Sequence, residues 1–169
     1  MSMSNSHVRC HGCNFEAVIA RRAVTLLYLL SDGRTVEGRR QLAWCDSCAN
    51  VTDAEEAIDT EAIRVSLEIA EKRRGSLLRR LFGRSADDAA ELESLRSKVF
   101  LARHRNSPPR CLRCGDATVR PLRFDIGGSS EIVHACGGKL YLVPEDPDAP
   151  RFMYKPQVIR LDSEGRKIS

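Results

Sequence analysis

Apolar and polar positions alternate in the first fifty residues in a way that predicts a β-hairpin. Residues 23–30 are rich in Val, Leu and Tyr and are expected to form one strand. The turn that follows is Ser31-Asp32-Gly33, and Asp-Gly is among the strongest hairpin signals. We expect residues 35–44 to return as the second strand.

The pattern changes to a helical period between residues 52 and 103. Apolar residues recur there at steps of three and four in two stripes: Ile58, Ala62, Val65 and Ile69, then Leu92, Leu95, Val99 and Ala102. Thr52-x-x-Glu55 has the form of a capping box, and Ser85-x-x-Asp88 predicts a second cap. We therefore expect an antiparallel pair of helices, joined by a link that contains Gly75, with the two stripes buried against each other.

Short strands are predicted again after the helix breaker Asn106-Ser107-Pro108-Pro109. The expected strands cover residues 118–124, 131–135, 139–143, 152–154 and 157–161. We expect the C-terminal strands to extend the sheet that the first three form.

Eight cysteine and histidine residues occur as four close pairs along this framework. The pairs are Cys10 and Cys13, Cys45 and Cys48, Cys111 and Cys114, and His134 and Cys136. Two ligands separated by one or two residues on a tight turn can bind one ion, and a second such turn completes a tetrahedron. The sequence therefore predicts two metal sites with four ligands each, and zinc is the metal that such ligands favour.

Spacing along the chain favours two sites, each made of two pairs that are neighbours in the sequence. The gap between Cys13 and Cys45 is 31 residues, and the gap between Cys114 and His134 is 19 residues. We expect the first site to consist of Cys10, Cys13, Cys45 and Cys48, and the second to consist of Cys111, Cys114, His134 and Cys136. His-x-Cys is one residue shorter than the usual ligand pair, which leaves His104 as the alternative fourth ligand of the second site. Gly115, Asn14 and Gly137-Gly138 suit the positive φ that such turns often need.

Residues 10–48 and 111–143 each resemble a zinc ribbon, a fold group in which two ligand-bearing turns lie on paired hairpins. The whole arrangement resembles that of uncharacterised bacterial proteins with a zinc ribbon at each end, and the resemblance implies metal and fold without implying an activity. The expected fold class is α+β, with two β-hairpin zinc ribbons joined by an antiparallel helical pair. The corresponding domains are residues 1–50, 51–105 and 106–169.

Composition and cysteine usage predict a cytoplasmic protein. The chain has 169 residues, begins with a polar segment rather than a signal peptide, and has no apolar run near the length of a membrane span. Six of its seven cysteines lie in Cys-x-x-Cys pairs. In a reducing compartment such pairs favour metal thiolates, and disulfides are the alternative interpretation.

Charge is unevenly distributed along a chain whose net charge is only +4. Between residues 71 and 113 there are twelve basic and five acidic side chains. Arg73, Arg74, Arg79 and Arg80 are the candidate contacts for an acidic protein or a nucleic acid. A solvated helical surface with charges in blocks is the alternative explanation.

The sequence favours a non-enzymatic interaction or adaptor protein. Two sites with complete ligand sets are typical of structural zinc, and no nucleotide-binding or nucleophile motif is present. Few aromatic residues are available for stacking on bases, so nucleic-acid binding is the second hypothesis. Trp44 lies directly before Cys45 and is expected to cover a zinc site, with ligand stacking as its alternative role.

Overall fold

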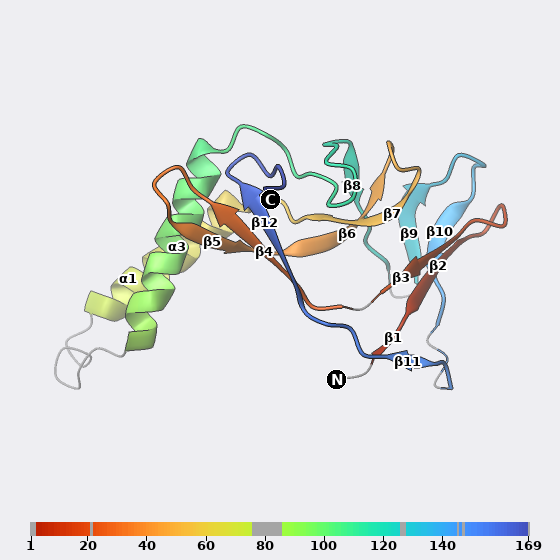
Figure 1. The fold of residues 1–169 in the computed structure, drawn as a ribbon, viewed down its shortest axis with the longest axis horizontal. Helices are drawn as coiled ribbons and strands as arrows, with labels where there is room; N and C mark the ends of the chain where they lie inside the picture. The colour runs from red at the N-terminus through yellow and green to blue at the C-terminus, as the bar shows by residue number, and fades with distance from the viewer. Residues whose placement is uncertain are drawn as a thin grey trace. The chain divides into compact units, whose positions relative to one another are not determined.

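The computed structural model describes residues 3–20, 22–75, 86–125, 128–144, 146 and 148–168, which form a mixed α+β structure (Figure 1). In chain order its elements are β1 (Met3–Ser4), β2 (Ser6–Cys10), β3 (Glu16–Ile19), β4 (Val24–Leu29), β5 (Thr35–Gly38), β6 (Arg40–Cys45), β7 (Asn50–Glu55), α1 (Thr60–Gly75), α3 (Ala86–His104), β8 (Val119–Pro121), β9 (Ser129–Val133), β10 (Lys139–Leu142), β11 (Arg151–Phe152) and β12 (Gln157–Asp162).

The chain divides into two compact units, each assembled from three separate stretches. Unit 1 contains residues 1–25, 39–56 and 108–159, and unit 2 contains residues 26–38, 57–107 and 160–169. This division differs from the consecutive domains expected from the sequence at residues 1–50, 51–105 and 106–169. The reason is that strands from the two ends of the chain pair with each other, which local spacing does not reveal.

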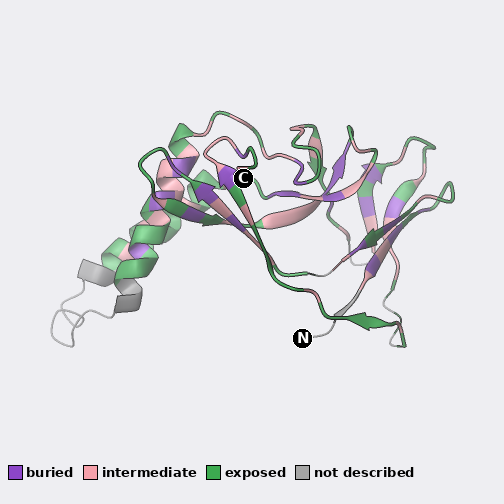
Figure 2. Cartoon of the chain, in the orientation of Figure 1, coloured by how far each residue is buried: buried purple, intermediate pink, exposed green. Residues whose placement is uncertain are grey.

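Unit 1 has a four-stranded antiparallel sheet with the strand order β3-β2-β10-β9. The central contact joins distant segments, since Cys10 of β2 lies opposite Leu140 of β10. Alternate residues along these strands are buried (Figure 2). With Trp44 and Leu122 they form one apolar core that includes Val8, Ala17, Ile19, Ile132 and Leu140.

A second sheet of unit 1 has the order β7-β6-β8. β6 and β7 form a hairpin from Arg40 opposite Glu55 to Cys45 opposite Asn50. β8 pairs along the other edge of β6, which becomes the central strand.

β4 and β5 form the hairpin around Gly33, but the predicted second strand over residues 35–44 is wrong in extent. It divides at Arg39 into β5, which pairs with β4, and β6, which belongs to the β7-β6-β8 sheet. A Cβ at Gly38 would lie 2.3 Å from an atom of the Tyr28 ring, so this close approach requires glycine. β12 lies on the other side of β4, and β11 pairs with β1, so the C-terminal strands do not extend the β3-β2-β10-β9 sheet.

The first helix begins later than its predicted capping box. Thr52 and Glu55 lie in β7 and are buried, and the Glu55 carboxylate accepts the N–H of Arg110 at 2.7 Å. The N-cap is instead Asp59, whose Oδ1 accepts the N–H of Ala62 at 2.9 Å. Strand pairing thus overrides a local capping signal.

The two helices of unit 2 contact each other, and α3 also contacts β5. Figure 1 shows α1 and α3 lying side by side. The partly buried face of α1 is Ile63, Leu67 and Ala70. The predicted stripe on α1 is therefore wrong, because Val65 and Ile69 are 43% and 45% exposed.

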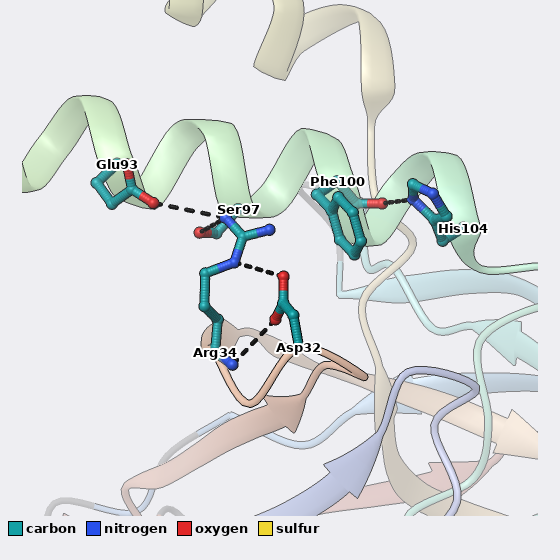
Figure 3. A network of polar contacts seen from close by, with 6 residues as sticks. All are labelled: Asp32, Arg34, Glu93, Ser97, Phe100 and His104. Atoms are coloured by element: carbon teal, nitrogen blue, oxygen red, sulfur yellow. Dashed lines mark hydrogen bonds and ion pairs between the residues drawn. The ribbon is translucent and has the colours of Figure 1, made fainter.

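One side of α3 is fixed by polar and ring contacts to the β4–β5 turn (Figure 3). The Arg34 guanidinium pairs with Asp32 at 2.8 Å and reaches Glu93 and Ser97 of α3 at 3.5 Å and 3.4 Å. It also lies 4.9 Å from the centre of the Phe100 ring. The turn and the helix are thus joined by a charge network that is open to solvent.

Leu101→Ala should destabilise unit 2 far more than Val65→Asp. Leu101 is 1% exposed, and truncating a buried leucine costs about 2–5 kcal/mol. Val65 is exposed, so its replacement should change the free energy of unfolding by only about 0.5 kcal/mol. Urea denaturation of both variants tests this, and equal midpoints would show that Leu101 does not belong to a core.

Glu164 should give unit 2 a stability that falls in acid. Its carboxylate accepts the N–H groups of Asn106 and Ser107 at 3.3 Å and 2.9 Å, and these bonds lower its pKa. Because the folded pKa lies below the unfolded value, the stabilisation is complete above about pH 4.5 and is lost as the pH falls through the folded pKa. Urea midpoints between about pH 3 and 6 should depend less on pH in Glu164→Gln than in the parent. Glu131→Gln controls for the change in net charge, and an identical pH dependence in the parent and Glu164→Gln would contradict the assignment.

Candidate metal centres

The turn between β2 and β3 and the turn between β9 and β10 bring four predicted ligands together. Cys10 is the last residue of β2 and Cys13 lies in the first turn, which closes with the Cys10 N–H bonded to the Phe15 carbonyl oxygen at 3.2 Å. His134 and Cys136 lie in the second, which is closed by the His134 N–H and the Gly138 carbonyl oxygen at 2.8 Å. We call the group Cys10, Cys13, His134 and Cys136 the outer site.

The outer donors are close enough for one ion. Cys10 Sγ lies 3.3 Å from Cys136 Sγ. His134 Nδ1 lies 3.3 Å from Cys136 Sγ and 3.5 Å from Cys13 Sγ. The imidazole therefore directs Nδ1 toward the thiols.

The other four ligands meet at the far end of the β6–β7 hairpin. Cys45 is the last residue of β6, and Cys48 lies in the turn that follows it. Cys111 and Cys114 lie in the turn before β8, which the Cys111 N–H closes on the Asp116 carbonyl oxygen at 2.7 Å. Cys45 Sγ lies 3.6 Å from Cys114 Sγ, and Cys48 Sγ lies 3.9 Å from Cys111 Sγ. We call the group Cys45, Cys48, Cys111 and Cys114 the inner site.

The predicted ligands are all brought together, but the predicted grouping is wrong. Cys10 and Cys13 share a site with His134 and Cys136, and Cys45 and Cys48 share one with Cys111 and Cys114. In the sequence, all four inner residues lie between the two pairs that form the outer site, so the sites are nested along the chain. This order arises because β2 pairs with β10 and β6 pairs with β8. β6 pairs with β7 and β8 rather than with β5, and Cys45 at its end lies beside Cys114.

Both donor sets fit a tetrahedral ion. Zn–S bonds of about 2.3 Å place the sulfur atoms of a regular tetrahedron about 3.8 Å apart. All donor atoms within each group lie within 4.8 Å of one another. The sulfur–sulfur separations of 3.3–3.9 Å are far longer than the roughly 2.05 Å of a disulfide, and all seven thiols are free.

Two glycines let the outer turns approach closely. A Cβ on Gly138 would lie 2.4 Å from the backbone nitrogen of Gly12 and 2.7 Å from Cys10 Sγ. A Cβ on Gly12 would lie 3.1 Å from Cys136 Sγ. From the sequence, Gly138 was expected to supply a positive φ. In the structure, glycine is required there because a side chain would clash with the facing turn.

In three of the four turns, the residue directly after the second ligand has a positive φ. Gly115 and Gly137 adopt φ values of 80° and 86°, as predicted. Ala49 after Cys48 has a φ of 46°, whereas Asn14 does not adopt a positive φ. The first turn thus reaches its conformation without this feature.

Hydrogen bonds act directly on the inner thiols. Burial raises the pKa of Cys111, but the Thr52 hydroxyl at 3.3 Å and the N–H groups of Arg113 and Cys114 outweigh it and lower this pKa to about 7. Burial raises the pKa values of Cys45 and Cys48, and neighbouring thiols raise that of Cys48 further. A cation among these sulfurs would favour their thiolate forms.

Polar side chains join the two inner turns to each other. The Ser47 hydroxyl donates to the Asp116 carboxylate, which also accepts the Thr118 N–H at 2.8 Å. These bonds, beginning with Ser47, lower the pKa of Asp116 to about 2. The carboxylate therefore stays ionised and holds the turns in register.

Trp44 packs against His134 of the outer site, although its neighbour Cys45 belongs to the inner site. It precedes Cys45 of the inner site, while its ring meets the His134 ring of the outer site edge-to-face at 5.5 Å. Phe15 lies on the same imidazole at 4.8 Å. Trp44 is 6% exposed, which disfavours its alternative role of stacking on a bound molecule.

Other predicted residues lie away from the two metal groups. His104 belongs to unit 2, where its Nδ1 donates to the Phe100 carbonyl oxygen at 2.8 Å and its ring stacks on Phe100 at 4.0 Å (Figure 3). Arg73 and Arg74 lie in α1, but their side chains, like the whole of Arg79 and Arg80, lie outside the described residues. Among the helices that the structure describes, none has the length and apolar character to cross a membrane.

No protein-family model, curated protein or solved structure matches the chain.

Proposed function

We propose that the protein is a tandem zinc-ribbon protein that holds two structural zinc ions. The observation that carries this proposal is that eight donors on four separate turns form two groups, one with four thiols and one with three thiols and an imidazole. Soft sulfur and borderline nitrogen donors in tetrahedral arrangement are the set that zinc prefers.

Complete donor sets support a structural role for the metal rather than a catalytic one. A catalytic zinc usually has three protein ligands and an open fourth position for water or substrate. Each site here offers four donors, so an ion would be saturated by protein. We accordingly propose a non-enzymatic protein in which zinc stabilises a scaffold.

The scaffold would then serve as an interaction or adaptor module. The excess of basic residues between positions 71 and 113 supports an acidic partner, and Arg73, Arg74, Arg79 and Arg80 are its proposed contacts. An acidic protein is the favoured partner, and nucleic acid is the alternative that the assay below separates from it. Free thiols at both sites support a reducing compartment, and we propose the cytoplasm.

Metal content gives the first test of the proposed function. Protein purified without chelator should contain two zinc ions per chain by elemental analysis. Metal removal should expose all seven thiols to a thiol reagent and abolish cooperative unfolding of unit 1, because site formation contributes folding free energy. A zinc content near zero in protein that still unfolds cooperatively would refute the proposal.

A salt-dependent binding assay tests the partner class. Random-sequence DNA and RNA and an acidic polypeptide are compared as probes over a range of salt concentrations. Preference for the polypeptide, with affinity that falls as salt rises, supports the adaptor function, whereas tighter binding of DNA or RNA supports the alternative. Replacement of Arg73, Arg74, Arg79 and Arg80 with Ala should weaken binding and leave the zinc content at two. Undiminished binding by this variant would show that these four arginines do not form the contact surface.

A further inference from the structure

Trp44 connects the two candidate metal sites within unit 1. Its indole ring meets the ring of the outer ligand His134 at 5.5 Å and an interplanar angle of 88°. Phe15 contacts both, at 5.6 Å from Trp44 and 4.8 Å from His134. The imidazole therefore has ring neighbours that restrict its orientation while Nδ1 faces the thiols.

The position of Trp44 depends on the inner site much more than on the outer one. It lies in the central strand β6, opposite Val51 of β7 and Arg120 of β8. Its indole N–H donates to Asp46 at 2.9 Å, and Asp46 lies between the inner ligands Cys45 and Cys48. An ion bound by the inner ligands would join the β6–β7 turn to the turn before β8 and so fix the strand that carries Trp44.

The lengths of chain that the two sites close also favour formation of the inner site before the outer site. The inner site closes a loop of 62 residues between Cys48 and Cys111, whereas the outer site closes 120 residues between Cys13 and His134. Each doubling of a flexible loop lowers its closure probability about threefold. Once the inner loop is closed, spans of only 31 and 19 residues lead to the outer turns.

We propose that the inner site binds zinc first and that Trp44 then positions His134 for the second ion, so that the two sites bind with positive cooperativity. The inference rests on the proposed function, since it requires zinc at both sites. It adds an order of binding and assigns Trp44 as a positioning residue that touches a ligand without ligating the metal.

Thermodynamic linkage makes this coupling reciprocal. Zinc at the inner site raises the affinity of the outer site, and zinc at the outer site raises that of the inner site by the same factor. The order of filling follows from the higher intrinsic affinity of the inner site, with its four thiols and shorter loop. Loss of the inner site should therefore leave the outer site weak, whereas loss of the outer site should leave a functional inner site.

Titration of the metal-free, reduced full-length protein with cobalt(II) and then zinc tests the order of binding. Four-thiolate and three-thiolate–imidazole cobalt centres differ in their visible absorption, so the two sites can be followed separately. The four-thiolate spectrum should develop first. Cys48→Ser should lower the zinc affinity of the outer site at least tenfold in chelator competition, and Cys13→Ser should leave one tightly bound ion at the inner site.

Replacement of Trp44 separates its positioning role from general folding. Trp44→Leu should weaken the outer site about tenfold and alter its cobalt spectrum while the inner spectrum is unchanged. Trp44→Phe should retain part of the affinity because an aromatic ring remains. Tyr141→Leu is the matched control, since Tyr141 stacks on the non-ligand His11 at 4.2 Å, and it should leave the coupling intact.

The outcomes distinguish this inference from the proposed function. Two zinc ions that bind independently, or an outer site that fills first, would overturn the inference and leave the zinc assignment standing. Unchanged outer affinity in Trp44→Leu would overturn the role of Trp44. Failure to bind zinc at either site would overturn both proposals.

Discussion

Replacing Cys13 and Cys136 together with serine should leave one zinc ion per chain, whereas replacing Cys13 and Cys48 together should leave none. Cys13 and Cys136 belong to the outer site, so their double variant damages a single donor set. Cys13 and Cys48 belong to different sites, so their double variant damages both. Grouping by sequence proximity would give the opposite pattern, because Cys13 and Cys48 would then share one ion.

Elemental analysis of the two purified variants measures this effect. Each lost ion should also remove several kcal/mol of folding free energy, since structural zinc contributes roughly 10–16 kcal/mol of apparent binding free energy in small domains. The Cys13 and Cys48 variant should therefore lack the cooperative unfolding of unit 1. Both variants have the same number of substitutions, so each serves as the control for the other. One zinc ion in the Cys13 and Cys48 variant would contradict the nested grouping.

Gly138→Ala should disrupt the outer site without altering any ligand. The new methyl group would lie 2.4 Å from the Gly12 nitrogen and 2.7 Å from Cys10 Sγ, so the two turns would have to separate. Overpacking against neighbouring atoms typically costs about 1–3 kcal/mol, and displacement of the metal should add to that cost. We expect one zinc ion by elemental analysis and a lower urea midpoint.

Gly137→Ala provides the adjacent control. Gly137 has a φ of 86°, and nothing lies within 4 Å of the position of its Cβ. Alanine there should cost only about 1–2 kcal/mol of backbone strain and leave both ions bound. Equal zinc loss in the two variants would show that turn conformation, rather than the close approach at Gly138, is the requirement.

Local signals predicted several elements well. Asp32-Gly33 marked the β4–β5 turn, and β-branched and aromatic residues marked β9, β10 and β12 close to their observed bounds. β2 and β3 were missed because they are short and partly polar, and their stability comes from pairing with each other and with β10. β7 was taken for the start of a helix, since Thr52 and Glu55 satisfy a capping pattern when tertiary pairing is ignored.

Helix faces were only partly readable from the sequence. The second predicted stripe includes Leu92, which is buried, but the more central buried residues of α3 are Ser97 and Leu101. A helix such as α1, with apolar residues on more than one side, allows several stripes. The neighbour that it packs against selects Ile63 and Leu67 and leaves Val65 exposed.

The sequence by itself identified the eight side chains that form the two candidate metal sites, because paired soft donors on tight turns are recognisable from spacing. Only the tertiary structure decided which turns share a site. The short sequence separation favoured placing Cys13 and Cys45 in one site. Pairing of β2 with β10 and of β6 with β8 instead placed turns that are distant in the sequence side by side. Loop-closure entropy grows only slowly with length, so strand pairing and burial outweigh the advantage of the nearer ligand pair.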